Sequence, residues 1–354
     1  MCAFYHKYWE FAQSAPTVRS RGDQYGAVES FAPLPALVEL LSRDAAAVDR
    51  SPSVPPDHLA AFAAAGLYGA FAPKELGGLE LPFAEACDVV EQLSAACLTT
   101  TFVWLQHFRL LGALLDPAAP ENLRLMLPSA ISGQVKGGVS LGGLLPGPAR
   151  LTAEATDGGW LLDGEAPWVS GWGIVDTLVV TAREGADSVA SFALEAKLGR
   201  GLSVTPLHLS AMNASSTVTL TFSHVIVPHD RYLGSQPYTP GTERPEGLRV
   251  NGALALGVAR RCCQMIGPSV LDDELAAARE ELDRAGAEAI HQARARASAL
   301  AVRCAHVLGV TTGSRSAISG DAAERATREA SLLLVFASRP AIKTALLERL
   351  FHES

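Results

Sequence analysis

Residues 161–183 read LLDGEAPWVSGWGIVDTLVVTAR, and this stretch determines which architecture is expected for the middle of the chain. Its two ends are rich in Leu, Val and Thr, which is typical of β-strands. The segment between them carries Trp168, Ser170 and Trp172 among Gly and Pro residues, whereas a plain hairpin needs only turn residues such as an Asp-Gly pair. Large rings beside a hydroxyl group suit a flat ligand with a polar edge. The sequence therefore predicts a strand-rich module with a ligand-binding bend.

The composition is typical of an acidic globular protein. The chain has 354 residues, 48% of them hydrophobic, and a formal net charge of -8, so two or three domains are expected. The negative charge argues against nucleic acid as a main partner, because phosphate binding needs a basic face. No apolar run reaches the roughly 18 residues of a membrane span, and the N-terminal residues lack the apolar core of a signal peptide. The six cysteines have no paired spacing, and no cluster has metal-ligand spacing. We therefore expect a cytoplasmic protein with reduced thiols that binds no metal, membrane or nucleic acid.

Three regions with different sequence patterns follow a tail at residues 1–33. Residues 34–131 have apolar residues at helical spacing and predict an N-terminal helical domain. Residues 132–240 contain short Val- and Thr-rich segments separated by Gly, Pro or charged turns, which predicts a barrel or sandwich of strands. Residues 241–354 return to Ala-rich helical patterns. The expected order is helices, a β domain, then helices.

This order, together with four local motifs, resembles the acyl-CoA dehydrogenase superfamily. Besides the opening stretch, the motifs are AFAAAGLYGAFAPKELGGLEL at 61–81, LTFSHVIVPHDRYLG at 220–234 and ERATREASLLLVF at 324–336. The resemblance implies an α+β multidomain fold with an N-terminal helical domain, a central β-barrel and a C-terminal four-helix bundle. It also implies a homodimer or homotetramer that holds FAD and oxidises the CH–CH group of an acyl-CoA or carrier-bound acyl thioester, a reaction of lipid metabolism.

The resemblance also implies which residues contact the flavin ring. In the family, a Trp-Ile-Ser/Thr loop packs against the ring, and an earlier loop supplies a hydroxyl and backbone groups. The matching positions in this sequence are Ser140, Leu141, Gly142, Trp168, Val169 and Ser170. The alternative is that Trp168 and Trp172 only close one end of the barrel.

Several family motifs for the rest of the cofactor are altered. Pro146 to Pro148 replace a Gly-Ser-Asp end near the pyrophosphate, and the expected Arg-x-x-Phe-Gly motif has no counterpart. The adenosine loop is reduced to Gly313, Ser314 and Arg315, whose backbone and guanidinium could still meet a phosphate. A helix end with a solvated arginine is an equally good interpretation.

The catalytic base is the largest departure from the family. The usual C-terminal glutamate position corresponds to Ala337, and the alternative position lies near Arg249 and Val250, so neither offers a carboxylate. Glu246, in a linker next to Glu243, and His107, in an apolar helix, are the remaining candidates. A solvated linker glutamate and a core histidine are the competing interpretations.

Three functions remain open from the sequence. The first is a flavin-dependent dehydrogenase acting on an acyl thioester. The second is a flavin monooxygenase of the same fold, for which loss of the glutamate is no defect. The third is a non-catalytic subunit of a heteromeric acyl-CoA dehydrogenase, in which a related subunit supplies the base.

Overall fold

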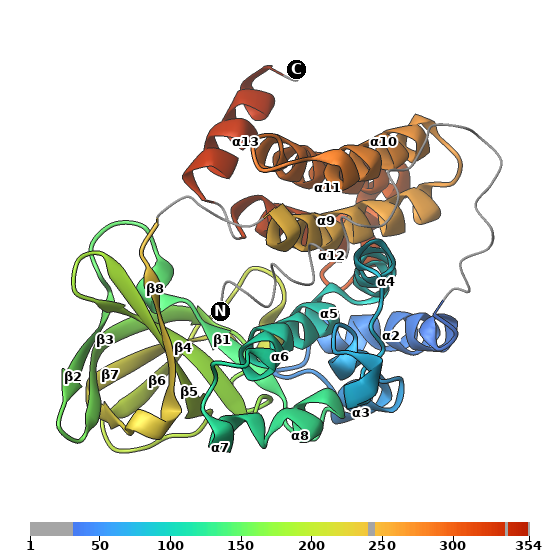
Figure 1. The fold of residues 1–354 in the computed structure, drawn as a ribbon. Coiled ribbons are helices and arrows are strands. Elements are labelled where there is room, and N and C mark those ends of the chain that lie inside the picture. The colour runs from blue at the N-terminus through green and yellow to red at the C-terminus, as the bar shows by residue number, and fades with distance from the viewer. Residues whose placement is uncertain (1–30, 240–244, 337–338, 353–354) are drawn as a thin grey trace.

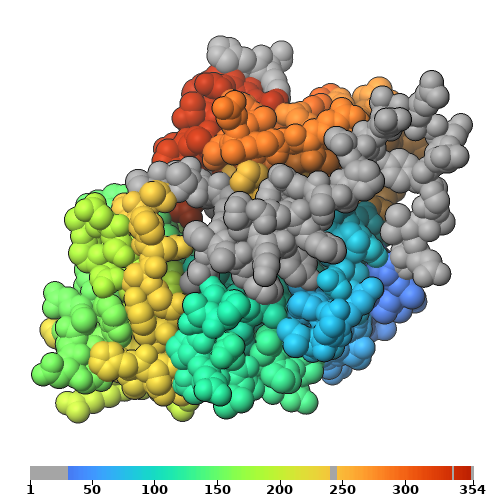
Figure 2. Space-filling model, viewed as in Figure 1, coloured from blue at the N-terminus to red at the C-terminus, as the bar shows by residue number. Residues whose placement is uncertain are grey.

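The structure is a computed structural model that describes residues 31–239, 245–336 and 339–352. Most of the expected tail at residues 1–33 therefore lies outside the described residues, and so do Glu243 and Ala337. Helices come first, a sheet follows, and a second group of helices closes the chain (Figure 1). The sheet lies beside the N-terminal helices, and the C-terminal helices lie above both (Figures 1 and 2).

The N-terminal part is a group of short helices built on apolar stripes. Its α-helices are α2 (Leu34–Asp49), α3 (Pro56–Ala64), α4 (Phe83–Ala96), α5 (Leu98–Leu105), α6 (His107–Leu115), α7 (Glu121–Arg124) and α8 (Leu127–Ile131). In α2 the buried residues Leu34, Leu37, Leu41, Ala45 and Val48 recur every three or four positions, so one face of the helix enters the core.

The middle part is one eight-stranded sheet. Its strands are β1 (Gly137–Ser140), β2 (Leu151–Thr156), β3 (Gly159–Val169), β4 (Thr177–Glu184), β5 (Ser188–Glu195), β6 (Leu202–Pro206), β7 (Val218–Val227) and β8 (Tyr232–Pro237). The hydrogen-bonded order is β6-β7-β3-β2-β4-β5-β8, and β1 pairs with β4 in parallel. The expectation of a closed barrel is corrected here. Among the described residues β6 and β8, at the two ends of this order, do not pair with each other, so the sheet is open.

Strand β4 is covered on both faces, which explains its nearly continuous apolar sequence. Leu178 and Val180 point into the core of the sheet domain. Val179, with the opposite orientation, packs with Leu110 of α6 in a separate apolar cluster. The N-terminal helices are therefore attached to the sheet through α6.

The C-terminal part is a bundle of helices whose core continues into the N-terminal helices. Its helices are α9 (Pro245–Ile266), α10 (Val270–Arg284), α11 (Ile290–Thr312), α12 (Ala322–Val335) and α13 (Pro340–His352). α11 contacts all the others, and α9 also packs against α4. One apolar cluster joins Leu41 of α2, Leu93 of α4, Leu254 of α9 and Leu333 of α12. The two helical parts therefore form a single packed body.

Candidate functional site

The bend at the end of β3 places a tryptophan ring in solvent. The pairing of β3 with β7 is irregular between Ala166 and Val169, as in a β-bulge. Within this bulge Trp168 has a φ of 63° and is 62% exposed. A positive φ is unfavourable for a bulky residue and is found mainly at functional sites, where the surroundings hold it in place.

Buried hydroxyl groups hold this bend against the neighbouring loop. Ser170 is buried, and its Oγ lies 2.7 Å from Oγ1 of Thr217, which lies 2.7 Å from Oγ of Ser215. The backbone N–H of Gly171 donates to the carbonyl of Ser215 at 2.8 Å. Val169 is fully buried in the sheet core. Of the predicted Trp-Val-Ser motif, only Trp168 therefore presents its side chain to solvent, while the other two fix the backbone.

The first predicted flavin loop lies directly beside this bend. Ser140 ends β1, and its buried Oγ has no hydrogen-bond partner among the described residues. Leu141, which is half-buried, leads into the 3-10 turn η3 (Gly142–Leu144). A Cβ atom on Gly142 would lie 3.2 Å from the Cβ of Ala166, two residues before Trp168. The structure thus brings the two loops together, although they are more than twenty residues apart in sequence.

Arg183 and Tyr238, which the sequence analysis did not select, bind the backbone carbonyls of the η3 loop. Arg183, at the end of β4, donates from Nε to the carbonyl of Gly143 at 3.2 Å and from Nη2 to that of Leu145 at 3.4 Å. The ring of Tyr238 lies 3.3 Å from the Arg183 guanidinium carbon, and its hydroxyl also donates to the Leu145 carbonyl at 3.3 Å. The available sequence signal was an arginine directly after the Val- and Thr-rich stretch of β4.

His107 occupies the junction between the helices and the sheet. It is only 1% exposed, and its Nδ1 accepts the backbone N–H of Gly137 at 2.9 Å. The Tyr68 ring packs edge-on against the imidazole at 4.9 Å. Burial lowers the pKa of His107 to about 4, with a smaller contribution from the charge of Lys136. This geometry favours a structural role that connects α6 to β1.

The other candidate positions for a base lie at the start of α9. Glu246 is half-buried in the first helical turn. Arg249 is buried and donates to Asp283 of α10 at 2.7 Å, while its Nη1 has no hydrogen-bond partner in the described parts of the chain. Near the position at which the sequence analysis expected the alternative base, the structure therefore places a buried arginine paired with a carboxylate.

The predicted adenosine-side residues are exposed at the end of α11. Gly313 has a φ of 73° and begins the 3-10 turn η6 (Gly313–Ala317), which also contains Ser314. Arg315 is largely exposed and pairs with Asp321 at 3.2 Å. Asp321 also caps the N-terminus of α12. The local ion pair leaves Arg315 less available to a phosphate than the sequence suggested.

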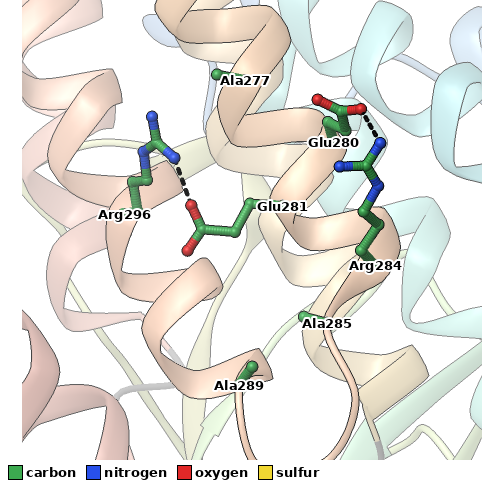
Figure 3. A pocket seen from close by; sticks show the side chains of 7 residues that line it. All are labelled: Ala277, Glu280, Glu281, Arg284, Ala285, Ala289 and Arg296. Atoms are coloured by element: carbon green, nitrogen blue, oxygen red, sulfur yellow. Dashed lines mark hydrogen bonds and ion pairs between the residues drawn. The ribbon is translucent and has the colours of Figure 1, made fainter.

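A surface pocket of about 420 Å³ lies elsewhere, between the end of α10 and the start of α11 (Figure 3). Its charged side chains are paired within the pocket, Glu280 with Arg284 and Glu281 with Arg296. The remaining lining residues are alanines. Because its charges are already neutralised, this pocket offers little to a polar ligand.

The described residues form neither a membrane-spanning helix nor a metal-binding cluster. No helix there has both the length and the apolar character needed to cross a membrane. No group of three or more His, Cys, Asp or Glu side chains comes close enough to hold a metal ion in that part of the chain. Five cysteines are described, all buried and free.

Comparison with known proteins identifies the relatives of this chain. Residues 37–134 match the family model described as acyl-CoA dehydrogenase, N-terminal domain. The mitochondrial isovaleryl-CoA dehydrogenase of Oryza sativa subsp. japonica is 28% identical over 210 residues, which cover 56% of this chain and 51% of that protein. The oxygenase component of the FADH(2)-dependent resorcinol hydroxylase of Rhizobium sp. is 28% identical over 280 residues, 75% of this chain and 62% of that protein. The chain thus spans about half the length of the first curated relatives it matches.

Solved structures share the fold over nearly the whole chain. A glutaryl-coenzyme A dehydrogenase in complex with glutaryl-CoA matches with a TM-score of 0.77 and 19% identity, covering 93% of this chain and 96% of that one. A glutaryl-CoA dehydrogenase from Mycobacterium smegmatis in complex with FADH2 matches with a TM-score of 0.74 and 16% identity, covering 94% and 95%. The predicted resemblance to the acyl-CoA dehydrogenase superfamily is confirmed. The fold is that of this superfamily, with helical N- and C-terminal parts around a central sheet.

Proposed function

We propose that this chain is an FAD-dependent oxidoreductase that acts on the CH–CH group of an acyl thioester carried by CoA or a carrier protein. The observation that carries the proposal is Trp168, an exposed ring held at a positive φ beside the η3 loop. The relatives that are named acyl-CoA dehydrogenases support the acyl substrate. A cytoplasmic homodimer or homotetramer, alone or with a related subunit, is part of the same proposal.

The residues at the bend fit the ring system of a flavin. The Ser140 hydroxyl is buried and makes no hydrogen bond within the described ranges, so it is free to meet a polar ring edge. Gly142 and Gly143 lack side chains where the backbone approaches β3 and β4, so the backbone of η3 packs close to the bend. The Trp168 indole would cover one face of the ring.

The division of roles at this site follows from these positions. FAD, when bound, supplies the acceptor for the hydrogen that leaves the β-carbon as hydride. Trp168 and Ser140 would orient the ring, while Arg183 and Ser170 keep the two loops in place. Removal of the α-proton requires a base, and Glu246 is the candidate carboxylate in the first turn of α9, three residues before Arg249. With alanine at position 337, we expect proton removal to be slow, because loss of a general base costs about 10²–10⁴-fold in rate.

The absorbance spectrum of the purified protein tests flavin binding. A yellow protein with a flavin spectrum is expected, and Trp168→Ala should lower flavin occupancy more than the matched variant Trp172→Ala. Trp172 is the control because it is a half-buried tryptophan in the same bend. Equal occupancy in the two variants would contradict the assignment, and a colourless wild type would favour a non-catalytic subunit.

A flavin monooxygenase of the same fold is the second candidate. Two points support it: Arg249, near the expected alternative base position on α9, is an arginine paired with Asp283, and the resorcinol hydroxylase component matches three quarters of this chain. Anaerobic mixing with acyl-CoA distinguishes the two candidates. In a dehydrogenase the acyl-CoA reduces the flavin, so the flavin absorbance is bleached without oxygen. Ala337→Glu should speed bleaching, whereas Ala337→Gln, which has the same shape without basicity, should not. Fast bleaching of the wild type would show that another residue serves as the base.

A further inference from the structure

A second cavity, of about 200 Å³, lies where the N-terminal helices meet the bundle. Its wall is formed by α2 and α4 on one side and by α9 and α12 on the other. Three arginines line it, Arg260 and Arg261 of α9 and Arg325 of α12, and none of the lining residues that the structure describes is acidic. The polar lining is completed by Ser42, Gln92 and Gln264. This wall is therefore rich in hydrogen-bond donors and positive charge.

Two of these arginines share one carboxylate deep in the interface. The side chains of Arg261 and Arg325 are each 9% exposed, and Glu329 between them is 5% exposed. Arg261 donates from Nη2 to Glu329, whereas the Nε of Arg325 lies 3.9 Å from it, beyond hydrogen-bond distance. One carboxylate neutralises one guanidinium, so this buried trio carries a net positive charge.

Arg260, the third arginine, does not have a carboxylate to itself either. The nearest buried acid is Glu91, whose two oxygens accept from Arg279 of α10 at 2.8 and 2.6 Å. Arg260 lies 3.5 Å from Glu91 and 3.8 Å from the half-exposed Asp88. The two buried carboxylates of this region, Glu91 and Glu329, therefore face four guanidinium groups.

Hydrogen bonding shows the same excess of donors. Nε and Nη1 of Arg261 and Nε of Arg325 are buried and make no hydrogen bond to any described residue. A buried charge is costly unless it is paired and hydrogen-bonded. An anion in the adjoining cavity would compensate this excess, and planar guanidinium groups match the oxygens of phosphate especially well.

We propose that this cavity, between α2, α4, α9 and α12, is a binding site for a phosphate group. The cavity exceeds the ~30 Å³ that one water occupies in the liquid, so it has room for a tetrahedral oxyanion. Arg260 and Arg325 supply the charge that Glu329 and Glu91 leave uncompensated. Gln92, Gln264 and Ser42 supply neutral hydrogen bonds. The phosphate comes from free inorganic phosphate or from a phosphomonoester.

Thermal unfolding of the full chain with increasing sodium phosphate tests the site, with ionic strength held constant by sodium chloride. We expect a saturable rise of the unfolding midpoint, because a ligand of the folded state stabilises it by mass action. Arg260→Gln should weaken the apparent Kd for phosphate by about tenfold or more, the usual effect of losing a charge-assisted hydrogen bond. Glycerol 3-phosphate in place of phosphate distinguishes the sources: binding of both identifies a phosphomonoester site, and binding of phosphate alone identifies a site for the free ion.

The matched control is Arg284→Gln, which removes an exposed arginine paired with Glu280 on α10. It should leave the phosphate response unchanged. Because Arg260 is partly exposed, its variant is expected to fold, and the unfolding midpoint without phosphate checks this. As a second variant, Arg325→Gln removes a guanidinium group that Glu329 does not neutralise and should also weaken binding. A phosphate response that is unsaturable, or equal in the wild type and Arg260→Gln, would overturn the proposal.

Discussion

Lowering the pH is expected to destabilise the protein through one histidine at the junction of helices and sheet. His107 is nearly inaccessible, and its Nδ1 already accepts the N–H of Gly137. Protonation would bring a charge into this apolar environment and would remove the acceptor. Burial accordingly lowers the pKa of His107 to about 4 in the folded chain, against about 6.5 in the unfolded chain.

The sign and size of the effect follow from linkage. As the pH decreases through about 6.5, the unfolded chain takes up a proton at this residue while the folded chain does not. Stability is therefore lost between about pH 6.5 and 4, and this residue has no further effect outside that window. The complete loss is about 3 kcal/mol, from a shift of roughly 2.5 pKa units at 1.36 kcal/mol each, and about 2 kcal/mol of it is reached at pH 5.

Urea denaturation of the wild type and His107→Gln at pH 7.5 and pH 5 measures this loss directly. The glutamine retains an acceptor but does not titrate, so the free-energy difference between the two proteins should narrow by about 2 kcal/mol at pH 5. Effects of all other titrating groups are common to both proteins and cancel. Parallel stability curves for the wild type and His107→Gln would refute the reasoning.

Two further predictions concern packing and assembly. In urea denaturation, Gly143→Ala should lower the free energy of unfolding by about 1–3 kcal/mol, because the new Cβ would lie 2.6 Å from the backbone of Ala182. The control Gly158→Ala, whose Cβ would have no atom within 4 Å, should change the free energy of unfolding by less than about 0.5 kcal/mol. Equal effects of the two substitutions would contradict the close approach at Gly143. Light scattering at micromolar concentration should show a dimer or larger oligomer, because α13 exposes the apolar side chains of Leu347, Leu350 and Phe351. Phe351→Asp should shift the protein toward the monomer. A monomeric wild type would disprove this prediction.

Local pattern was enough to predict the main architecture. The three- and four-residue spacing of Leu34, Leu37 and Leu41 gave the helical character of the N-terminal part, and it is this stripe that enters the core. Short Val-rich segments gave the strands. Closure into a barrel was not predictable in the same way, because it depends on whether β6 and β8 meet, and no residue in either strand encodes that distance.

The candidate site shows the same division between local and long-range information. The ring-and-hydroxyl bend was visible in the sequence, and the resemblance selected Trp168 over Trp172, but the exposure of each ring was not visible there. The bulge in the pairing with β7 exposes Trp168, and the orientation of Ser170 depends on Thr217, 47 residues away. The Arg183 contacts with Gly143 and the His107 contact with Gly137 likewise join residues that only the tertiary structure brings together.

The three hydroxyls behind the bend have a consequence for proton order. Each of Ser170, Thr217 and Ser215 has a single hydrogen, and the two contacts at 2.7 Å can be made with all hydrogens pointing one way along the row or all pointing the other. In one order the Ser170 hydroxyl donates its hydrogen to Thr217 and can only accept a hydrogen bond from any other neighbour. In the reversed order it receives a hydrogen from Thr217 and has its own to give. The same oxygen can thus serve a neighbour that donates or one that accepts, and the change requires rotation of three O–H bonds without moving a heavy atom.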